Sequence, residues 1–175
     1  MLVLLVLVPY TGPARGDPTL SPCSYAGSDG IAEHADCVEQ YGKGLLRIRS
    51  PHLGRLTFDE NSMASVFNGE HGWMYVNKKG EVVVAGVSAI DNGPETFQDG
   101  FVRFERNRKC GYAVLKGPGT IAPQFDGCEN FKNGIARVCT GCRSEPVGPG
   151  SEYHEMRGGT WFCIDRKGKK VACAP

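Results

Sequence analysis

The sequence lacks an excess of charge of either sign. Its 175 residues include 20 Lys and Arg and 19 Asp and Glu, which gives a formal net charge of +1. Nucleic acids and anionic membranes are bound largely through clustered positive charge, so a balanced chain offers no electrostatic argument for either. We therefore expect no nucleic-acid partner.

Long apolar runs are also lacking. The unbroken run Leu2 to Val8 has seven residues, whereas a membrane-spanning helix needs about 20. Ala14-Arg15-Gly16 then places small residues at the −3 and −1 positions of a cleavage site. We predict a secretory signal peptide over residues 1–16, cleaved before Asp17, and no integral membrane span. A buried N-terminal strand is the alternative, because no Lys or Arg precedes the apolar run.

Recognisable catalytic motifs are lacking too, since the chain has no G-x-S-x-G nucleophile motif. Cys139-Thr140-Gly141-Cys142 is the one motif with chemical potential, because CxxC can be half of a zinc site or a redox dithiol. A zinc site would have to recruit Cys128 and His154, and no βαβ pattern of a thioredoxin surrounds the motif. We favour structural disulfides and predict no catalytic residue, metal ligand or cofactor. A thiol- or metal-dependent enzyme using Cys139 and Cys142 is the alternative.

Glycine and proline, by contrast, are abundant, with 24 Gly and 11 Pro, which favours many turns and short strands. One stretch, Trp73 to Val84, occurs in three versions, the others being residues 110–121 and 161–172. Each version has an apolar strand, a basic residue, a glycine at the eighth position and an apolar return strand. These three glycines predict hairpin turns with positive φ: Gly80, Gly117 and Gly168.

A second phrase repeats beside the hairpin. It has an aromatic residue, a glycine three positions later, and then an arginine between apolar residues; the three versions start at Tyr41, Phe97 and Phe131. This pattern is typical of a turn that leads into a strand with one buried face. Trp73 and Cys110, which begin two of the hairpins, are 37 residues apart (110 − 73), and two phrases that recur together indicate a repeat architecture.

These residues resemble WG-repeat (WG beta-repeat) proteins. The best matches are Gly111-Tyr112, Pro123 to Asp126, and Phe131 to Val138. The Trp-Gly pair itself is intact nowhere, since Met74 follows Trp73. The resemblance implies an all-β fold, a short array of antiparallel β-hairpin repeats. It also implies a bacterial, exported interaction scaffold without a family-wide catalytic residue.

Eight cysteines, an even number, fit an oxidising compartment, so we expect a periplasmic or secreted protein held by disulfides. The last hairpin brings Cys163 opposite the strand that ends at Cys173, which predicts a disulfide between them. Cys23 and Cys37 are a second candidate disulfide, which would cross-link the N-terminal segment. The pairing of the other four stays open: Cys110, Cys128, Cys139 and Cys142.

We expect one repeat domain, residues 45–175, after an irregular N-terminal segment at 17–44 with a short helix near 31–41. Within the domain, residues 140–159 depart from the repeat and read as an inserted loop. Unique loops on a regular frame commonly carry recognition. The predicted binding residues are those of types favoured in interfaces: Arg143, Tyr153, His154, Met156 and Arg157.

The leading functional hypothesis is a non-enzymatic scaffold that binds an unknown protein partner. The alternative partner is a cell-wall carbohydrate, stacked on exposed aromatics such as Trp73 and Trp161. Recurrence of these two residues at matching positions favours packing between repeats. Basic tracts at the turns, among them residues 106–109, are interpreted as solvated turn residues, with a one-sided basic ridge as the alternative.

Overall fold

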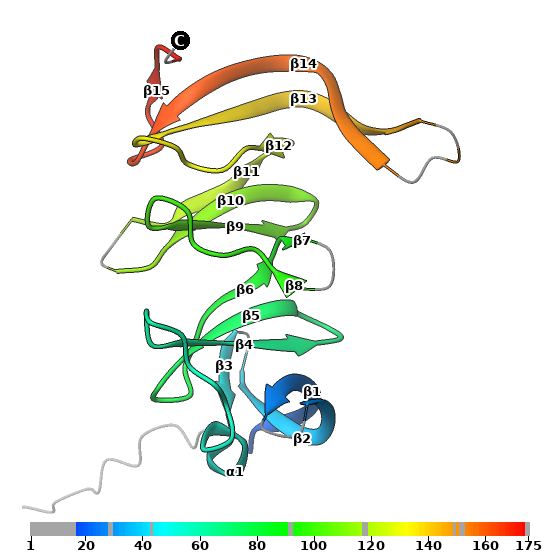
Figure 1. Ribbon diagram of the computed structural model, residues 1–175, viewed down its shortest axis with the longest axis vertical. Coiled ribbons are helices and arrows are strands. Elements are labelled where there is room, and N and C mark those ends of the chain that lie inside the picture. The colour runs from blue at the N-terminus through cyan, green and yellow to red at the C-terminus, as the bar shows by residue number, and fades with distance from the viewer. Residues whose placement is uncertain are drawn as a thin grey trace, which may run out of the picture.

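The structure is a computed structural model that describes residues 17–27, 30–42, 44–90, 93–116, 119–148, 150 and 153–173. It is nearly all β, and its hairpins are stacked along the long axis of the molecule (Figure 1). In chain order the elements are β1 (Thr19–Gly27), β2 (Gly30–Tyr41), β3 (Leu45–Ile48), α1 (Ser50–Leu53), β4 (Met63–Asn68), β5 (Gly72–Asn77), β6 (Val82–Val87), β7 (Ala89–Ile90), β8 (Gly93–Pro94), β9 (Phe101–Arg106), β10 (Lys109–Val114), β11 (Ile121–Phe125), β12 (Gly127–Cys128), β13 (Ile135–Val147), β14 (Tyr153–Asp165) and β15 (Lys170–Val171).

All strand pairs of the described chain are antiparallel. Nine strands form one long sheet in the order β11-β10-β9-β6-β5-β4-β1-β2-β3, and four form a second in the order β12-β13-β14-β15. Strands β7 and β8 form a small separate pair. Neighbours in the sheets are mostly neighbours in sequence, as short hairpin connections require. The predicted all-β array of antiparallel hairpins is confirmed.

The repeated hairpins have the same turn. In the first, Asn77 Oδ1 accepts the N–H groups of Lys79 and Glu81 at 2.9 and 3.1 Å. In the last, Asp165 Oδ1 accepts two N–H groups in the same way, at 2.8 and 2.9 Å. Gly80 and Gly168 have φ of 77° and 76°, which confirms the positive φ predicted for them. Gly117 lies outside the described residues.

The second repeated phrase also forms equivalent structures. Its glycines, Gly100 and Gly134, both have φ of 82° and sit in two-residue turns before β9 and β13. The aromatic that opens each phrase packs on the tyrosine of the preceding hairpin. Phe97 lies 5.0 Å from Tyr75 between ring centroids, and Phe131 lies 4.7 Å from Tyr112. The sequence repeat is therefore a repeat of contacts, which bury one aromatic pair per unit.

The N-terminal segment is not irregular, and the helix expected near residues 31–41 is wrong. Residues 19–27 and 30–41 instead form the antiparallel ribbon of β1 and β2. A helix this short is marginal unless an apolar stripe packs it against a core. The ribbon instead buries Cys37 and Val38 fully against β4 and β5, with Cys23 bonded to Cys37. The predicted disulfide of this segment is thus confirmed, but it joins two strands.

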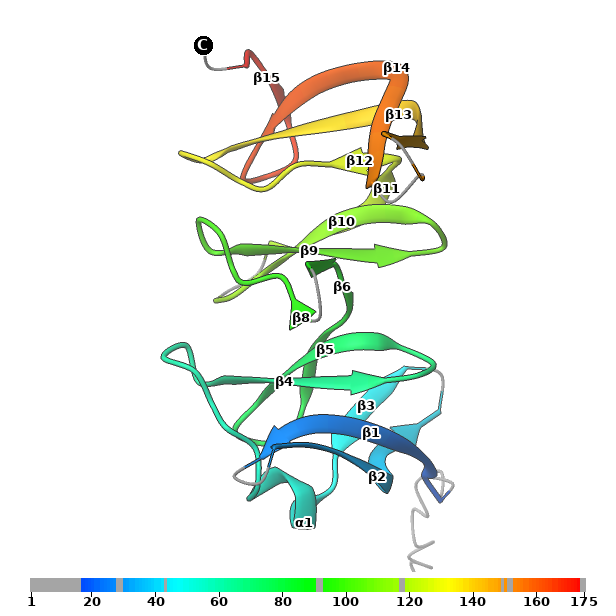
Figure 2. The ribbon, with the colours of Figure 1, turned by 45° about the vertical axis from the view of Figure 1, so that its right-hand side comes forward.

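Residues 140–159 are not an inserted loop either. Strands β13 and β14 pair as one ribbon from Ile135↔Asp165 to Val147↔Tyr153. We call the part beyond Thr140 the arm. Gly141 and Gly159 have φ of 76° and 66° and are the one position without pairing along the ribbon, whose register is the same on both sides of them. Figure 2 shows the far half of β14 turned towards the layer of β9 and β10. The glycines that suggested a loop therefore lie where a continuous ribbon bends.

Four disulfides use all eight cysteines, including the predicted Cys163–Cys173 pair. The four cysteines left open pair as Cys110–Cys128 and Cys139–Cys142. Such cross-links persist in oxidising compartments. The predicted signal peptide, residues 1–16, lies outside the described residues. Within the described chain, no helix has the length and apolar character needed to cross a bilayer.

Candidate functional site

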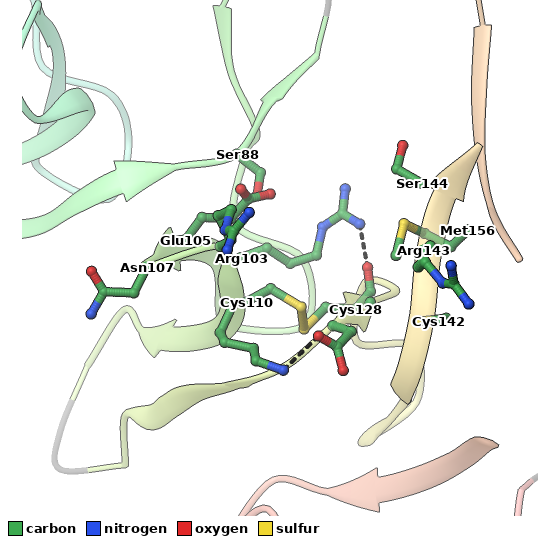
Figure 3. Close-up of a pocket in the computed structure, with 14 residues that line it drawn as sticks. Ser88, Arg103, Glu105, Asn107, Cys110, Cys128, Cys142, Arg143, Ser144 and Met156 are labelled. Carbon is green, nitrogen blue, oxygen red and sulfur yellow. Dashed lines mark hydrogen bonds and ion pairs between the residues drawn. A yellow bond between two sulfur atoms is a disulfide. The ribbon is translucent and has the colours of Figure 1, made fainter. Parts of the chain in front are cut away.

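A groove of about 810 Å³ lies between the arm and the layer of β9 and β10 (Figure 3). One wall is the β9–β10 turn, which carries Arg108 and Lys109. The other wall is the arm, with Cys142–Ser144 of β13 and Met156 of β14. Arg103 and the segment Asp126–Cys128 lie between the walls. Because cations come from both walls, we call it the basic groove.

The groove exists because two neighbouring strands separate. Strand β12 pairs with β13 through Gly127↔Cys139 and Cys128↔Val138. Strand β11 comes just before β12 in the chain, separated from it by Asp126 alone, but β11 pairs with β10 and not with β13. Strand β13 continues past this point as the arm, so its edge leaves β12 behind. The resulting space is a consequence of sheet topology and does not depend on any single side chain.

Asp126 stands where the two strands separate and links the walls. Its Oδ1 accepts a hydrogen bond from Lys109 Nζ at 2.5 Å, and its Oδ2 accepts the backbone N–H of Gly141 at 2.7 Å. These two bonds, that of Lys109 first, hold the pKa of Asp126 below its usual range. The carboxylate therefore stays charged at neutral pH and ties the base of the arm to β10.

Arg103 is the most enclosed cation of the groove. Its guanidinium forms a bidentate ion pair with Glu95, a side chain that is only 1% exposed. It also donates to the backbone carbonyl of Cys128 at 2.5 Å. Burial lowers the pKa of Arg103, but a guanidinium keeps its charge in proteins. Because each of its three nitrogens donates to Glu95 or to the Cys128 carbonyl, we infer that Arg103 holds the two sides of the groove together.

Arg108, at the tip of the β9–β10 turn, has an unusual backbone. Asn107 and Arg108 have φ of 54° and 60°, the conformation of a two-residue hairpin turn of the primed type. Asparagine tolerates this conformation, whereas a long side chain such as arginine seldom adopts it, and glycine is the usual residue. The turn therefore holds an exposed arginine at the groove mouth at some cost in stability.

The structure brings two of the five predicted binding residues to the groove and leaves the others elsewhere. Arg143 and Met156 line it. His154 is exposed on the arm and is not part of the lining, and Arg157 pairs with Glu155 at 3.1 Å. Tyr153 begins β14, but its side chain lies outside what the structure describes. That these five residues contact a partner stays a prediction.

Sequence reasoning missed the opposite wall. The tract at residues 106–109 was interpreted as solvated, yet Arg108 and Lys109 line the groove together with residues of the arm. Asp126, which entered the sequence analysis only as part of the WG-repeat resemblance, bridges the two walls. A basic tract directly at a predicted turn was the available signal for Arg108 and Lys109. No local pattern pointed to Asp126, because Gly141 lies 15 residues away.

The CxxC motif lies at the base of the arm as a disulfide. Cys139 is fully buried and Cys142 is 5% exposed. Among the described residues, no group of three or more His, Cys, Asp and Glu side chains is placed to hold a metal ion. The disulfide spans Gly141, so its structural effect is to tie together the two sides of the bend. This arrangement supports the structural interpretation of the motif.

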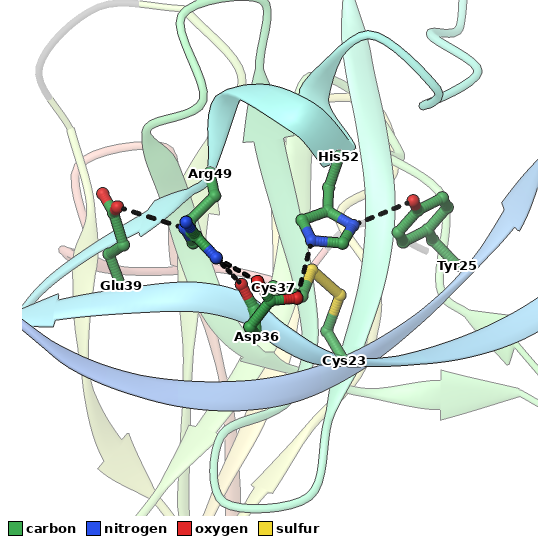
Figure 4. A network of polar contacts seen from close by, with 7 residues as sticks. All are labelled: Cys23, Tyr25, Asp36, Cys37, Glu39, Arg49 and His52. Atoms are coloured by element: carbon green, nitrogen blue, oxygen red, sulfur yellow. Dashed lines mark hydrogen bonds and ion pairs between the residues drawn. A yellow bond between two sulfur atoms is a disulfide. The ribbon is translucent and has the colours of Figure 1, made fainter.

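A second polar cluster lies at the opposite end of the molecule, under the N-terminal ribbon (Figure 4). His52 of α1 is buried and contacts Tyr25 Oη with Nδ1 and Asp36 Oδ1 with Nε2, both at 3.2 Å. Burial would raise the pKa of Asp36, but the His52 hydrogen bond and the charge of Arg49 together lower it. Because the Tyr25 hydroxyl and His52 are both buried, this cluster pins α1 to the ribbon.

The two tryptophans are half-buried and contact their neighbours. Trp73 meets Phe67 edge-on, with ring centroids 5.4 Å apart. The guanidinium carbon of Arg137 lies 4.5 Å from the centre of the Trp161 ring and so occupies one of its faces. These contacts favour the packing role over a platform for sugar stacking.

Comparison with known proteins agrees with the repeated contacts. Residues 120–141 match the family model described as WG containing repeat. The match spans β11, β12 and the start of β13, and thus the point where the basic groove opens. Neither the curated proteins nor the solved structures contain a significant match to the chain. The matched repeat and the recurring hairpin contacts together support a WG-repeat-containing protein.

Proposed function

We propose that this protein is an exported, non-enzymatic binding module that recognises a protein partner with its arm and the basic groove. The observation that carries the proposal is the arm itself. The repeated units use their strands to bury aromatic pairs and disulfides, whereas the arm extends beyond them with mostly exposed side chains. An element that contributes little to the core and lines a groove of binding-site size is suited to recognition.

Three further observations support the proposal. The repeat match is compatible with a repeat-type binding module. Four disulfides suit a protein that works outside the reducing cytosol. The groove walls are held from behind by Asp126 and Arg103, so the exposed residues at its mouth are presented on a rigid support, which lowers the entropic cost of binding.

Deletion of the arm tests the proposal. Removing residues 144–157 joins Arg143 to Gly158, next to the paired residues Cys142 and Gly158, and leaves the three core clusters intact. We expect cooperative unfolding to persist and the partner captured from an extract of the producing cells to be lost. Capture at the wild-type level by this variant, with folding verified by near-ultraviolet circular dichroism, would contradict the proposal.

A matched pair of glycine variants tests whether the direction of the arm matters. A Cβ added at Gly159 would lie 2.4 Å from the backbone N of Cys142, whereas one added at Gly158 meets nothing within 4 Å. Both glycines have positive φ, so both alanine variants carry the same backbone strain. Gly159→Ala should also shift the arm and weaken partner capture. Gly158→Ala should keep it. Equal capture by the two variants would show that the bend is irrelevant to binding.

The enzyme alternative has a direct test as well. If the Cys139–Cys142 disulfide is structural, Cys142→Ser alters stability and leaves any turnover in the purified protein unchanged. A reaction of the wild-type protein that disappears in Cys142→Ser, while partner capture persists, would replace the binding proposal by a thiol-dependent activity.

A further inference from the structure

The arm has a free strand edge inside the basic groove. On the side away from β14, strand β13 pairs with β12 only at Val138 and Cys139. From Cys142 onward this edge pairs with no other strand in the part of the chain that the structure describes. Free edges present unpaired N–H and C=O groups that can accept a further strand. Pro146 has no N–H, so it ends the usable edge after Glu145.

Two arginines without an ion pair line the groove at this edge, and Glu145 is the acidic residue at its far end. Arg143, on the edge strand, and Arg108, on the facing turn, are exposed and form no ion pair with any described residue. Glu105 is the opposing charge of the groove, and Figure 3 shows it beside Ser88, on the side away from the arm. A ligand that lies along β13 therefore meets Arg143 on the strand, shares the groove with Arg108 and keeps clear of Glu105.

The molecule already contains one carboxylate bound in this way. Asp126 accepts the N–H of Gly141, just before the free edge begins, while Lys109 neutralises its charge. A carboxylate is thus stabilised between a backbone N–H of β13 and a cation of the opposite wall. Arg108 and Arg143 also line the groove, and neither forms an ion pair with a carboxylate of the described residues.

We infer that the basic groove binds an extended peptide with acidic side chains, which adds as a strand to the free edge of β13 between Cys142 and Glu145. The inference rests on the proposed function and names its partner class. The peptide backbone lies beside β13 beyond the end of its pairing with β12, where β11 pairs with β10 instead. The carboxylates of the peptide pair with Arg108 and Arg143. Four residues span about 14 Å, so the contact suits a short linear motif.

A synthetic peptide tests the inference directly. The probe is fluorescein-labelled Thr-Glu-Val-Glu-Val-Glu, whose glutamates share one face when it is extended. Its control replaces each Glu by Lys. Titration of the full chain, followed by fluorescence anisotropy, should show saturable binding of the acidic peptide and at least about tenfold weaker binding of the control. Equal affinity for the two peptides, or no binding of either, overturns the inference.

Backbone methylation separates strand addition from charge attraction alone. Two acidic peptides carry N-methyl groups at alternate positions, one at the odd and one at the even residues. Only one set of N–H groups faces the edge of β13, so one methylated peptide should lose binding and the other should retain it. Loss in neither peptide means that the acidic chain binds without strand addition.

Charge reversals locate the site on the protein. Arg143→Glu and Arg108→Glu should each weaken binding about tenfold. Arg55 is an exposed arginine beside α1, far from the groove in sequence and fold. Arg55→Glu makes the same change in net charge and should leave the affinity for the peptide unchanged. If Arg55→Glu weakens binding as much as Arg143→Glu, the attraction is general and the groove assignment fails.

Competition decides between a peptide and another anionic polymer. An acidic oligosaccharide, oligogalacturonate, should displace the labelled peptide no better than the Lys-containing control does. Displacement at concentrations equal to those of unlabelled acidic peptide overturns the assignment to a peptide. If the arm deletion abolishes partner capture but the acidic peptide does not bind, the proposed function stands and this inference fails.

Discussion

The two ends of the molecule each carry a long two-stranded ribbon with one disulfide at its base or within it, yet they are used differently. The β1–β2 ribbon lies on the core, with Cys23, Tyr25, Cys37 and Val38 buried in one apolar cluster. The arm of β13 and β14 buries Cys139 and Cys142 at its base and is mostly exposed beyond them. A ribbon that packs on the core stabilises the fold, and one that leaves it is free to bind.

The difference comes from what covers each ribbon. Helix α1 closes the N-terminal ribbon, and the buried His52 joins it to Tyr25 and Asp36. At the other end, Gly141 and Gly159 bend the arm away from its own sheet, and Asp126 fixes the base. A two-stranded ribbon thus packs on the core at one end of the molecule and forms a groove wall at the other.

Removal of the disulfide in each ribbon should give the largest difference in the free energy of unfolding between the two ends. Replacing Cys23 and Cys37 by Ala should lower the free energy of unfolding by about 3 kcal/mol, because the bond closes a loop with a sequence separation of 14. Replacing Cys139 and Cys142, with a separation of 3, should cost about 2 kcal/mol. Urea denaturation measures both. A larger loss for the second pair would mean that the arm, and not the N-terminal ribbon, supports the core.

Histidine substitutions give the next largest contrast. His52→Ala removes the partner of the buried Tyr25 hydroxyl and should destabilise the protein by roughly 1–3 kcal/mol. His154→Ala, on the exposed arm, should change stability by less than about 0.5 kcal/mol. The midpoints of urea unfolding curves provide the comparison. If both variants unfold like the wild type, the polar cluster of Figure 4 does not pin α1.

The β9–β10 turn should show a smaller effect of opposite sign. Arg108→Gly removes a long side chain from a positive-φ position and should raise the free energy of unfolding by up to about 1 kcal/mol. It should at the same time weaken binding of the acidic peptide. Asn107→Gly is the matched control, with less gain because asparagine tolerates this φ. A loss of stability in Arg108→Gly would show that the arginine holds the turn and was not retained for binding.

The smallest expected effect is a dependence on pH. Because the pKa of Asp126 is lowered in the folded protein, its contribution is present above the unfolded value of about 3.9 and is lost as the pH falls through the folded value. The stability difference between wild type and Asp126→Asn should be constant above about pH 5 and shrink below about pH 4. A difference that stays constant down to pH 2 would mean that the carboxylate charge does not tie the arm to β10.

The repeated turns were predictable because their information is local. The eighth-position glycine and the Asn or Asp three residues before it lie within one turn, and the structure uses them alike in the hairpins at Gly80 and Gly168. The Cys163–Cys173 bond was predictable for the same reason, since one tight turn fixes which residues face each other. The N-terminal ribbon was not, because its strands are held by burial against β4 and β5, which come later in the chain.

The sequence by itself determined the all-β class, the repeat of hairpins and the kinship to the WG containing repeat, since short-range pairing and turn chemistry are written in neighbouring residues. Tertiary structure alone decided that glycine-rich residues 140–159 form a bent arm, that Asp126 joins Gly141 to Lys109, and that Arg108 and Arg143 line the same groove. These relations depend on the point where the chain passes from β11, which pairs with β10, to β12, which pairs with β13. Strand partners are chosen by the burial that the whole sheet achieves, which no local pattern contains.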